Sequence, residues 1–342
     1  SLKLNITILN DTDDKLGDNA EARVGATPDI VKNYVASGHK VTVVKGAGKY
    51  ANHYDADYKS AGAIISSSNK VACKDADLVL SITGKDAKFV AGLKSGSGIT
   101  GLMNPTDNPK YAEACAKANV TAFALEYIPR ISRAQSMDVL SSQSNLSGYR
   151  AVVEGASIYG RAMPMMMTAA GTIAPAKCFI MGVGVAGLQA IATSRRLGAV
   201  TTATDVRPAT KEQVASLGAK FIAVENEEFK EAETAGGYAK QMSSEYQKLQ
   251  AELTASHIAK QDIVITTALI PGRAAPILVT KSMIANMRPG SVLVDLAAER
   301  GGNVEGAVPG KIVETKNGVK IVGLLNWPSR LASDASAMFS KN

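Results

Sequence analysis

The sequence predicts an α/β protein with two doubly wound domains, each built on a mostly parallel β-sheet. Three observations lead to this prediction. Short β-rich stretches alternate with helical stretches along almost the whole chain, as in sheets whose parallel strands are joined by helices. The 342 residues are enough for about two domains with apolar cores. A long helical stretch lies between the two series and is suited to bridge the domains.

The first αβ series begins with a strand and continues through a well-marked helix. Residues 2–9 alternate and are β-rich, which is typical of a strand. Helix, turn and strand follow within residues 26–44, with Thr27 as N-cap and Pro28 as first helical residue. Gly38 marks the end of that helix. Further strands are expected at 77–82, 98–103 and 120–126, and a helix at 109–118.

A long helix is expected within residues 137–167, and a second αβ series follows it. The Met165–Met167 run is expected to pack in a core, because methionine fills irregular apolar gaps. A hairpin around Asn317–Gly318 is expected near the end of the series, within residues 310–326. The strands and helices between these two features are expected at 176–184, 185–199, 200–206, 208–219, 220–224, 262–270 and 290–299.

The composition is that of an ordinary globular protein, with 46% hydrophobic and 20% charged residues. Aromatic residues make up 5%, which offers no stacking platform for nucleic acid. The net charge of +7 comes from scattered lysines rather than a basic run. No apolar run reaches the ~18 residues that a membrane span needs, and no secretory signal is found, so we expect a soluble chain.

The cysteines give no sign of a metal site. Cys73, Cys115 and Cys178 form no CxxC pair and no cluster with histidine. An odd number at unrelated spacings also argues against a disulfide framework. We therefore expect no bound metal and a reducing compartment.

A glycine-rich turn in the second half predicts a dinucleotide site. Gly182, Gly184 and Gly187 form GxGxxG between an apolar strand and an alanine-rich helix, and Asp205 ends the next strand. Gly182 allows the turn, Gly184 lets the backbone approach a pyrophosphate, and Gly187 lets helix press on strand. The free N–H groups of the helix would hold the phosphate charge. The first half has no such fingerprint, so one nucleotide site per chain is expected.

Asp205 favours NAD(H) over NADP(H), because a carboxylate accepts hydrogen bonds from a ribose hydroxyl and repels a 2′-phosphate. Arg207, two residues on, complicates the choice. It could bind that phosphate, or it could lie over the adenine or at the rim of the site. We expect NAD(H), with the role of Arg207 open.

No residue in the sequence has the setting of a general acid or base for a dehydrogenase. The three histidines, His39, His53 and His257, are expected at the surface. Hydride transfer between two nicotinamides needs no proton relay, because it depends on the alignment of two C4 atoms. The absence therefore fits transfer between nucleotides.

Several long motifs resemble one family. They are "PRISRAQSMDVLSSQSNLSGYRAV", "PMMMTAAGT", "GVGVAGLQAIATSRRLGAVTTATDVR", "ATKEQVASLGAKF", "AETAGGYAK", "ITTALIPGR" and "VDLAAERGGN". Together they resemble the NAD(H)-binding component, domain I, of proton-translocating NAD(P) transhydrogenase, which shares its fold with alanine dehydrogenase. The resemblance covers nearly the whole chain, and its first motif is highly specific.

The resemblance implies that the donor-rich first motif holds the nicotinamide end of NAD(H). Arg130 and Ser141 would contact the carboxamide or its surroundings, and Asp138 would fix the orientation of the ring. Gln135 would face the nicotinamide of NADP(H) on a partner domain. The alternative is a solvated linker with helix caps, for which the serines alone suffice.

The resemblance also implies the remaining cofactor contacts. Pyrophosphate contacts would come from the turn, adenosine contacts from the strand after it, nucleotide closure from a mobile loop, and nicotinamide borders from a further strand end. In that order the residues are Val185, Ala186 and Gly187; Asp205, Val206 and Arg207; Gly237, Tyr238 and Gln250; and Thr267, Ala268 and Leu269. An exposed helical excursion is the alternative for the loop, residues 233–250.

Departures from alanine dehydrogenase decide between the two relatives. Arg23 stands where that enzyme has its substrate-carboxylate arginine. Its catalytic lysine position holds Thr83, and its catalytic histidine position falls near Met103 or Asn104. Oxidative deamination therefore has no evident acid or base here.

By resemblance, two Rossmann-like domains lie around a cleft: 1–136 with 327–342, and the NAD(H)-binding domain 137–326. NADH bound there would pass hydride directly to NADP+ bound on a partner domain, coupled to proton translocation by a membrane domain. The chain would be active only with both of those parts and would form a homodimer, with no nucleic acid partner. It would lie beside an energy-transducing membrane, on the bacterial cytoplasmic or organelle-interior side. A stand-alone amino-acid dehydrogenase and a non-catalytic NAD sensor remain as alternatives.

Overall fold

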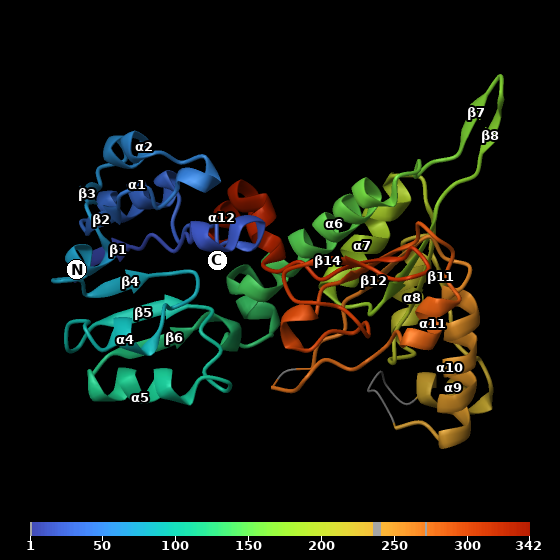
Figure 1. The fold of residues 1–342 in the computed structure, drawn as a ribbon. Coiled ribbons are helices and arrows are strands. Elements are labelled where there is room, and N and C mark those ends of the chain that lie inside the picture. Colours follow the sequence, from blue (N-terminus) through green and yellow to red (C-terminus); the bar gives the residue numbers. More distant parts are fainter. Residues whose placement is uncertain (1, 235–240, 271) are drawn as a thin grey trace. The chain divides into compact units, whose positions relative to one another are not determined.

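The computed structural model describes residues 2–234, 241–270 and 272–342 (Figure 1). It divides into two compact units, Ser1–Gln143 with Pro328–Asn342 and Ser144–Trp327. Each unit contains a β-sheet with its own apolar core. The predicted α/β class with two mostly parallel sheets is confirmed.

The first unit is built on a six-stranded sheet in the order β3-β2-β1-β4-β5-β6, in which all neighbours are parallel. The strands are β1 (Asn5–Ile8), β2 (Lys40–Val44), β3 (Ile64–Ser66), β4 (Leu78–Leu80), β5 (Gly98–Gly101) and β6 (Thr121–Ala124). The order reverses between β1 and β4, which makes the sheet doubly wound. Thr27 is the N-cap and Pro28 the first residue of the following helix, as predicted.

Helices and 3₁₀ turns connect these strands. The helices of the unit are α1 (Pro28–Ala36), α2 (Asp55–Ser60), α3 (Asn69–Ala72), α4 (Ala87–Val90), α5 (Pro109–Lys117) and α12 (Ala332–Lys341). The 3₁₀ segments are η1 (Asp14–Asn19), η2 (Lys49–Ala51), η3 (Leu125–Tyr127) and η4 (Ser132–Met137), with η6 (Trp327–Leu331) leading into α12. The C-terminal segment therefore returns to complete the first unit.

The second unit is built on a seven-stranded sheet in the order β11-β10-β9-β12-β13-β15-β14. Only the last pair is antiparallel, and it is the predicted hairpin, with Gly318 at a φ of 81° in its turn. The strands are β9 (Lys177–Met181), β10 (Val200–Thr204), β11 (Lys220–Phe221), β12 (Ile263–Thr266), β13 (Val292–Asp295), β14 (Ile312–Glu314) and β15 (Lys320–Val322). The helices are α6 (Val139–Tyr159), which begins in the first unit, α7 (Val185–Arg196), α8 (Thr210–Ser216), α9 (Glu227–Thr234), α10 (Ser244–Ile258), α11 (Lys281–Ala285) and the 3₁₀ turn η5 (Ala298–Arg300).

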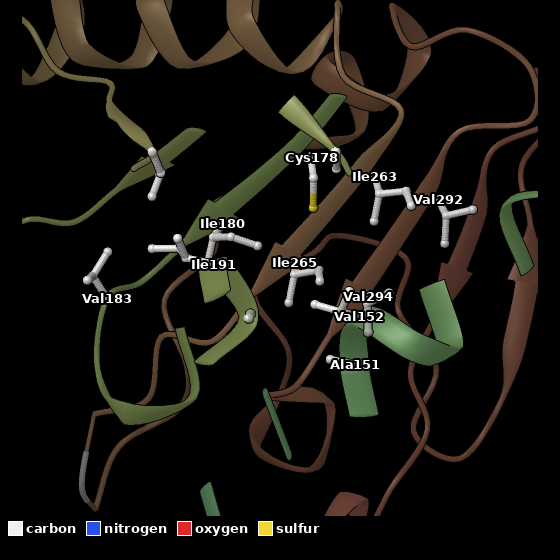
Figure 2. Packing of buried hydrophobic residues seen from close by; sticks show 14 of the residues in the cluster. Ala151, Val152, Cys178, Ile180, Val183, Ile191, Ile263, Ile265, Val292 and Val294 are labelled. Carbon is white, nitrogen blue, oxygen red and sulfur yellow. The ribbon is translucent and has the colours of Figure 1, made fainter. Parts of the chain in front are cut away.

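The central strands of this sheet are buried on both faces, which explains their nearly continuous apolar sequences. Successive side chains point to opposite faces, so Ile263 and Ile265 join one core cluster and Val264 joins the other. Figure 2 shows the first cluster, in which Ala151 and Val152 of α6 lie beside side chains of β12 and β13. The packing fixes the carboxyl ends of these strands, where a ligand would bind.

The Met165–Met167 prediction is wrong. The long helix α6 ends at Tyr159, and Met166 and Met167 lie in β7 (Met166–Thr168), which pairs with β8 (Gly171–Ile173) as an antiparallel hairpin. The three methionine side chains are 43–79% exposed rather than buried. Figure 1 shows this hairpin extending away from the sheet of its own unit. Among the described helices none is both long and apolar enough to cross a membrane.

Candidate functional site

The turn between β9 and α7 has the geometry that its glycines require. Gly182 has a φ of +107°, a conformation that residues with a Cβ rarely adopt. A Cβ there would lie 2.5 Å from the Thr267 hydroxyl oxygen. A Cβ on Gly187 would lie only 1.8 Å from the Gly182 carbonyl oxygen, so the helix presses directly on the strand end. Both positions exclude every residue except glycine.

Gly184 differs from its two neighbours in the motif. It is the N-cap of α7, with extended backbone angles, and a Cβ built on it would meet nothing within 4 Å. The folded chain therefore does not itself need glycine here. The open space lies beside the first N–H groups of a 12-residue helix, which are the groups that bind phosphate in other proteins.

Gly148, which the sequence reasoning missed, supports the turn from below. A Cβ on this α6 residue would lie 2.1 Å from the Ala186 carbonyl oxygen. The backbones of α6 and α7 thus approach closely beneath the first turn of α7. The only signal in the sequence is a glycine inside an otherwise helical pattern, which often marks such an approach.

Asp205, directly after β10, is held by four N–H groups. Its carboxylate accepts hydrogen bonds from the Val183 N–H at 2.7 Å and the Arg207 N–H at 2.8 Å. Arg207 adds its Nε at 3.0 Å and its Nη2 at 3.2 Å, and Nη2 also donates to the Val183 carbonyl. The hydrogen bond to Asp205 raises the pKa of Arg207. Arg207 thus lies against Asp205, whereas the Val206 side chain between them is 76% exposed.

The carboxyl end of β12 joins the turn through Thr267. The Thr267 hydroxyl donates to the Gly182 carbonyl at 3.0 Å, and the Thr267 N–H donates to Met181 at 2.9 Å. Ala268 follows, and the Leu269 side chain beyond it is 53% exposed. The structure therefore brings the glycine turn and Thr267–Leu269 together in one unit.

Asn303, a second residue that the sequence reasoning missed, fixes this strand end. Its side chain accepts the Ala268 N–H at 3.1 Å and donates to the Ala268 carbonyl at 2.9 Å. The Asn303 N–H in turn donates to the buried Asp295 carboxylate, whose pKa is raised by burial and partly lowered by the backbone N–H groups that it accepts. Both residues belong to the "VDLAAERGGN" motif, and an aspartate ending a buried apolar strand was the available signal.

The predicted loop residues are only partly described. The Gln250 side chain accepts the Val224 N–H at 3.0 Å and so connects α10 to the segment after β11. Gly237 and Tyr238 lie outside the described residues.

In the first unit the structure brings three of the four predicted nicotinamide residues together. Asp138 precedes α6 and accepts the Ser141 N–H at 3.0 Å and the Ser141 hydroxyl at 2.6 Å. Arg130 donates to the Ser141 hydroxyl at 2.9 Å and lies 3.5 Å from the Asp138 carboxylate. The Gln135 side chain, in η4, is exposed and has no hydrogen-bond partner among the described residues.

The electrostatics of this cluster favour an ionised Asp138. Partial burial acts to raise the pKa of its carboxyl, but the Ser141 hydroxyl and N–H and the Arg130 guanidinium hold that pKa below its usual value. The Arg130 side chain is 58% exposed, so one face of the cluster is open to a ligand. It offers a guanidinium and a hydroxyl, the groups that suit a carboxamide.

The residues at the alanine dehydrogenase positions offer no acid–base chemistry. Arg23 is buried, and its guanidinium is paired with the Glu21 carboxylate at 2.8 Å and donates to Gln143 at 2.9 Å. Its charge is therefore neutralised within the fold. Thr83 is exposed and bonds the Lys85 N–H, and Met103 is buried.

The expectation of a surface position for His257 is wrong. Its ring packs edge-on against Phe179 with centroids 4.6 Å apart, and its Nε2 is 2.7 Å from the Thr202 hydroxyl. Burial, with Lys260, Lys220 and Lys177 nearby, lowers its pKa to about 4. It is therefore a neutral packing residue at pH 7. Among the described residues no group of three or more His, Cys, Asp or Glu side chains is placed to hold a metal ion.

Comparisons with known proteins agree with this geometry. Two family models match the chain: "Alanine dehydrogenase/PNT, N-terminal domain" over residues 17–147 and "Alanine dehydrogenase/PNT, C-terminal domain" over residues 151–342. The first of the separate chains that form the NAD(P) transhydrogenase alpha subunit of Rhodospirillum rubrum is 54% identical over 327 residues, which are 94% of this chain and 85% of that protein.

Two solved structures are also similar. The transhydrogenase structure from Sinorhizobium meliloti superposes with a TM-score of 0.88 at 52% identity, covering 98% of this chain and 90% of that one. An L-alanine dehydrogenase structure reaches a TM-score of 0.76 at 26% identity, covering 98% and 86%. The similarity to the transhydrogenase is therefore greater in both sequence and structure.

Proposed function

The chain belongs to the alanine dehydrogenase/PNT family, and from this premise we propose that it is the NAD(H)-binding component of a proton-translocating transhydrogenase. Its homology to the transhydrogenase alpha subunit supports an oxidoreductase role. Under this proposal NADH bound to the second unit passes hydride to NADP+ bound on a partner domain. A membrane domain couples that transfer to proton translocation.

The observation that carries the proposal is the open space at Gly184. Gly182 and Gly187 are explained by packing within the chain, but Gly184 is not. A glycine with space around it at the N-terminus of a helix fits the close approach of a pyrophosphate. The residues therefore fit a dinucleotide, and Val185 and Ala186 would supply N–H groups to it.

NAD(H) rather than NADP(H) is proposed for this site because Asp205 faces the turn through its bond to Val183. A carboxylate there repels a 2′-phosphate. Its acceptor positions are taken by Val183 and Arg207. Arg207 would therefore shift from Asp205 when a ribose hydroxyl donates to this carboxylate.

When bound, NADH would supply the hydride at C4 of its nicotinamide. The residues of this chain bind and orient the ring and transfer no proton. Arg130 and Ser141 would hold the carboxamide, and Asp138 would fix both of them through the bonds described above. Gln135, whose side chain has no partner among the described residues, would face the partner's nucleotide. Alignment of two C4 atoms is the contribution to catalysis.

We propose a homodimer on the basis of the β7–β8 hairpin. Met165, Met166, Met167 and Ile173 are 40–79% exposed on or beside it. A two-stranded hairpin is marginally stable alone in water, so a partner surface would stabilise it. The complex would lie at an energy-transducing membrane, on the bacterial cytoplasmic or organelle-interior side.

The deciding experiment is a stopped-flow mix of the NADH-loaded chain with a partner domain loaded with NADP+. Rapid NADH oxidation that requires both components supports the proposal. Alanine-dependent reduction of NAD+ by the chain alone would instead support the amino-acid dehydrogenase. Nucleotide binding without transfer in the mixture would support a sensor.

A further inference from the structure

A chain of side-chain hydrogen bonds in the first unit leads from a buried ion pair to α6. The Glu21 and Arg23 side chains pair at 2.8 Å and are only 8% and 7% exposed. Arg23 donates from Nη1 to the Gln143 carbonyl oxygen at 2.9 Å. Gln143, itself 4% exposed, donates from Nε2 to the Ser142 hydroxyl oxygen at 3.2 Å. The ion pair thus reaches Ser142, the residue directly after Ser141.

Asn342, which follows α12, continues this chain back to η4. The Ser142 hydroxyl donates to the Asn342 side-chain oxygen at 2.7 Å. The Asn342 side-chain nitrogen donates to the Ser136 carbonyl at 2.8 Å. Ser136 and Ser142 lie on either side of the Asp138–Ser141 turn. One amide group therefore holds both ends of that turn at a fixed separation.

The framework behind this amide is firmly anchored. Ser336 of α12 accepts the Val24 N–H at 3.0 Å, and Ser340 accepts the Thr27 N–H at 3.1 Å. Gln143 also donates to the Ala335 carbonyl at 3.1 Å. Because α12 is bonded to the segment before α1 and to α6, the Asn342 side chain is presented from a rigid base.

We infer that Ser142, Gln143 and Asn342 are positioning residues, which hold Asp138 and Ser141 in the arrangement that orients the nicotinamide. The inference rests on the proposed function. These three residues need not touch the nucleotide. They act through the ends of the turn, while Glu21 and Arg23 anchor them at a distance from it. Arg23, at the position of a substrate-binding arginine in alanine dehydrogenase, serves here to hold Gln143.

The expected consequence follows from the steep dependence of transfer rate on alignment. A misplacement of about 1 Å reduces the rate of a well-oriented reaction by up to about 10²-fold. Loss of the Asn342 bridge leaves Arg130, Asp138 and Ser141 chemically intact but frees both ends of the turn. Hydride transfer should therefore fall much more than NADH affinity.

The test compares Ser142→Ala and Asn342→Ala with Ser340→Ala. Ser340→Ala is the matched control, because it removes an α12 hydrogen bond to Thr27 and none to the turn. Alanine is well tolerated in helices, and thermal melts establish that each variant is folded. Single-turnover transfer to the NADP+-loaded partner domain is measured together with the NADH dissociation constant from nucleotide fluorescence. Hydrogen exchange at the Ser141 amide reports on the turn itself.

We expect Ser142→Ala and Asn342→Ala to slow transfer about tenfold and to weaken NADH binding less than about threefold. Exchange at the Ser141 amide should accelerate in both. Ser340→Ala should match the wild type in transfer and in exchange at Ser141. Wild-type transfer rates in Ser142→Ala and Asn342→Ala, or equal slowing in Ser340→Ala, overturn the inference and leave the proposed function standing. A wild-type chain that binds no NADH or transfers no hydride refutes the proposed function, and the inference with it.

Discussion

Gly184→Ala separates the requirements of the fold from those of the ligand. The wild-type backbone at this position has a φ of −84° and a ψ of −162°, which alanine adopts without strain. The added Cβ meets no atom within 4 Å. Alanine is a poorer N-cap than glycine by up to about 1 kcal/mol. It also reduces the entropy of the unfolded chain, which stabilises by about 0.4–1 kcal/mol. The free energy of unfolding should therefore change by less than about 1 kcal/mol.

The same Cβ should strongly weaken NADH binding. It would point into the space where the pyrophosphate is expected to approach the backbone. A hydrogen bond to a charged group contributes about 1.5–3 kcal/mol, so the loss of one such bond weakens binding by roughly ten- to a hundredfold. Urea unfolding gives the stability, and titration of NADH fluorescence gives the dissociation constant.

Gly187→Ala is the matched control for this pair of measurements. Its Cβ would lie 1.8 Å from the Gly182 carbonyl oxygen, so this variant should lose several kcal/mol of stability, as forced contacts in packed regions do. A Gly184→Ala variant that binds NADH with wild-type affinity would refute the assignment of the pyrophosphate site. One that unfolds like Gly187→Ala would refute the argument from open space.

Three further predictions concern single side chains. Asp205→Ala should weaken NADH binding by about 1–3 kcal/mol through loss of charge-assisted hydrogen bonds, and unchanged affinity in a fluorescence titration would remove Asp205 from the site. Gln135→Asn should slow single-turnover hydride transfer but leave NADH affinity nearly intact, because the Gln135 side chain is exposed and has no partner among the described residues; strongly weakened NADH binding would contradict that role. His257 has a pKa lowered to about 4 from 6.5, so the unfolded state binds the extra proton and stability falls as pH drops from about 6.5 towards 4. At pH 5 the loss should be about 1 kcal/mol after allowance for partial exposure. Urea unfolding at pH 7.5 and 5 should show a smaller drop in His257→Gln than in the wild type, with His53→Gln as control, and equal drops would count against burial as the cause.

The sequence by itself determined the features that neighbouring residues encode. Thr27 and Pro28 start a helix because their own conformational preferences suit the N-cap and the first turn. The apolar strands around Ile263 and Val292 read as buried because both of their faces are covered. The spacing of Gly182, Gly184 and Gly187 could be recognised because the turn and the helix that follows are local.

Only the tertiary structure decided which distant groups meet. Arg207 pairs with Asp205 and Val183, and His257 packs on Phe179, because helices and strands far apart in sequence were brought together. The Met166 side chain is exposed because its segment folds out as a hairpin, although its apolar character fits a core equally well. The bond between Ser142 and Asn342 joins residues 200 positions apart. Residue type and spacing limit what a side chain is able to bond, but they carry no information on which of many chemically equivalent partners packing will place beside it.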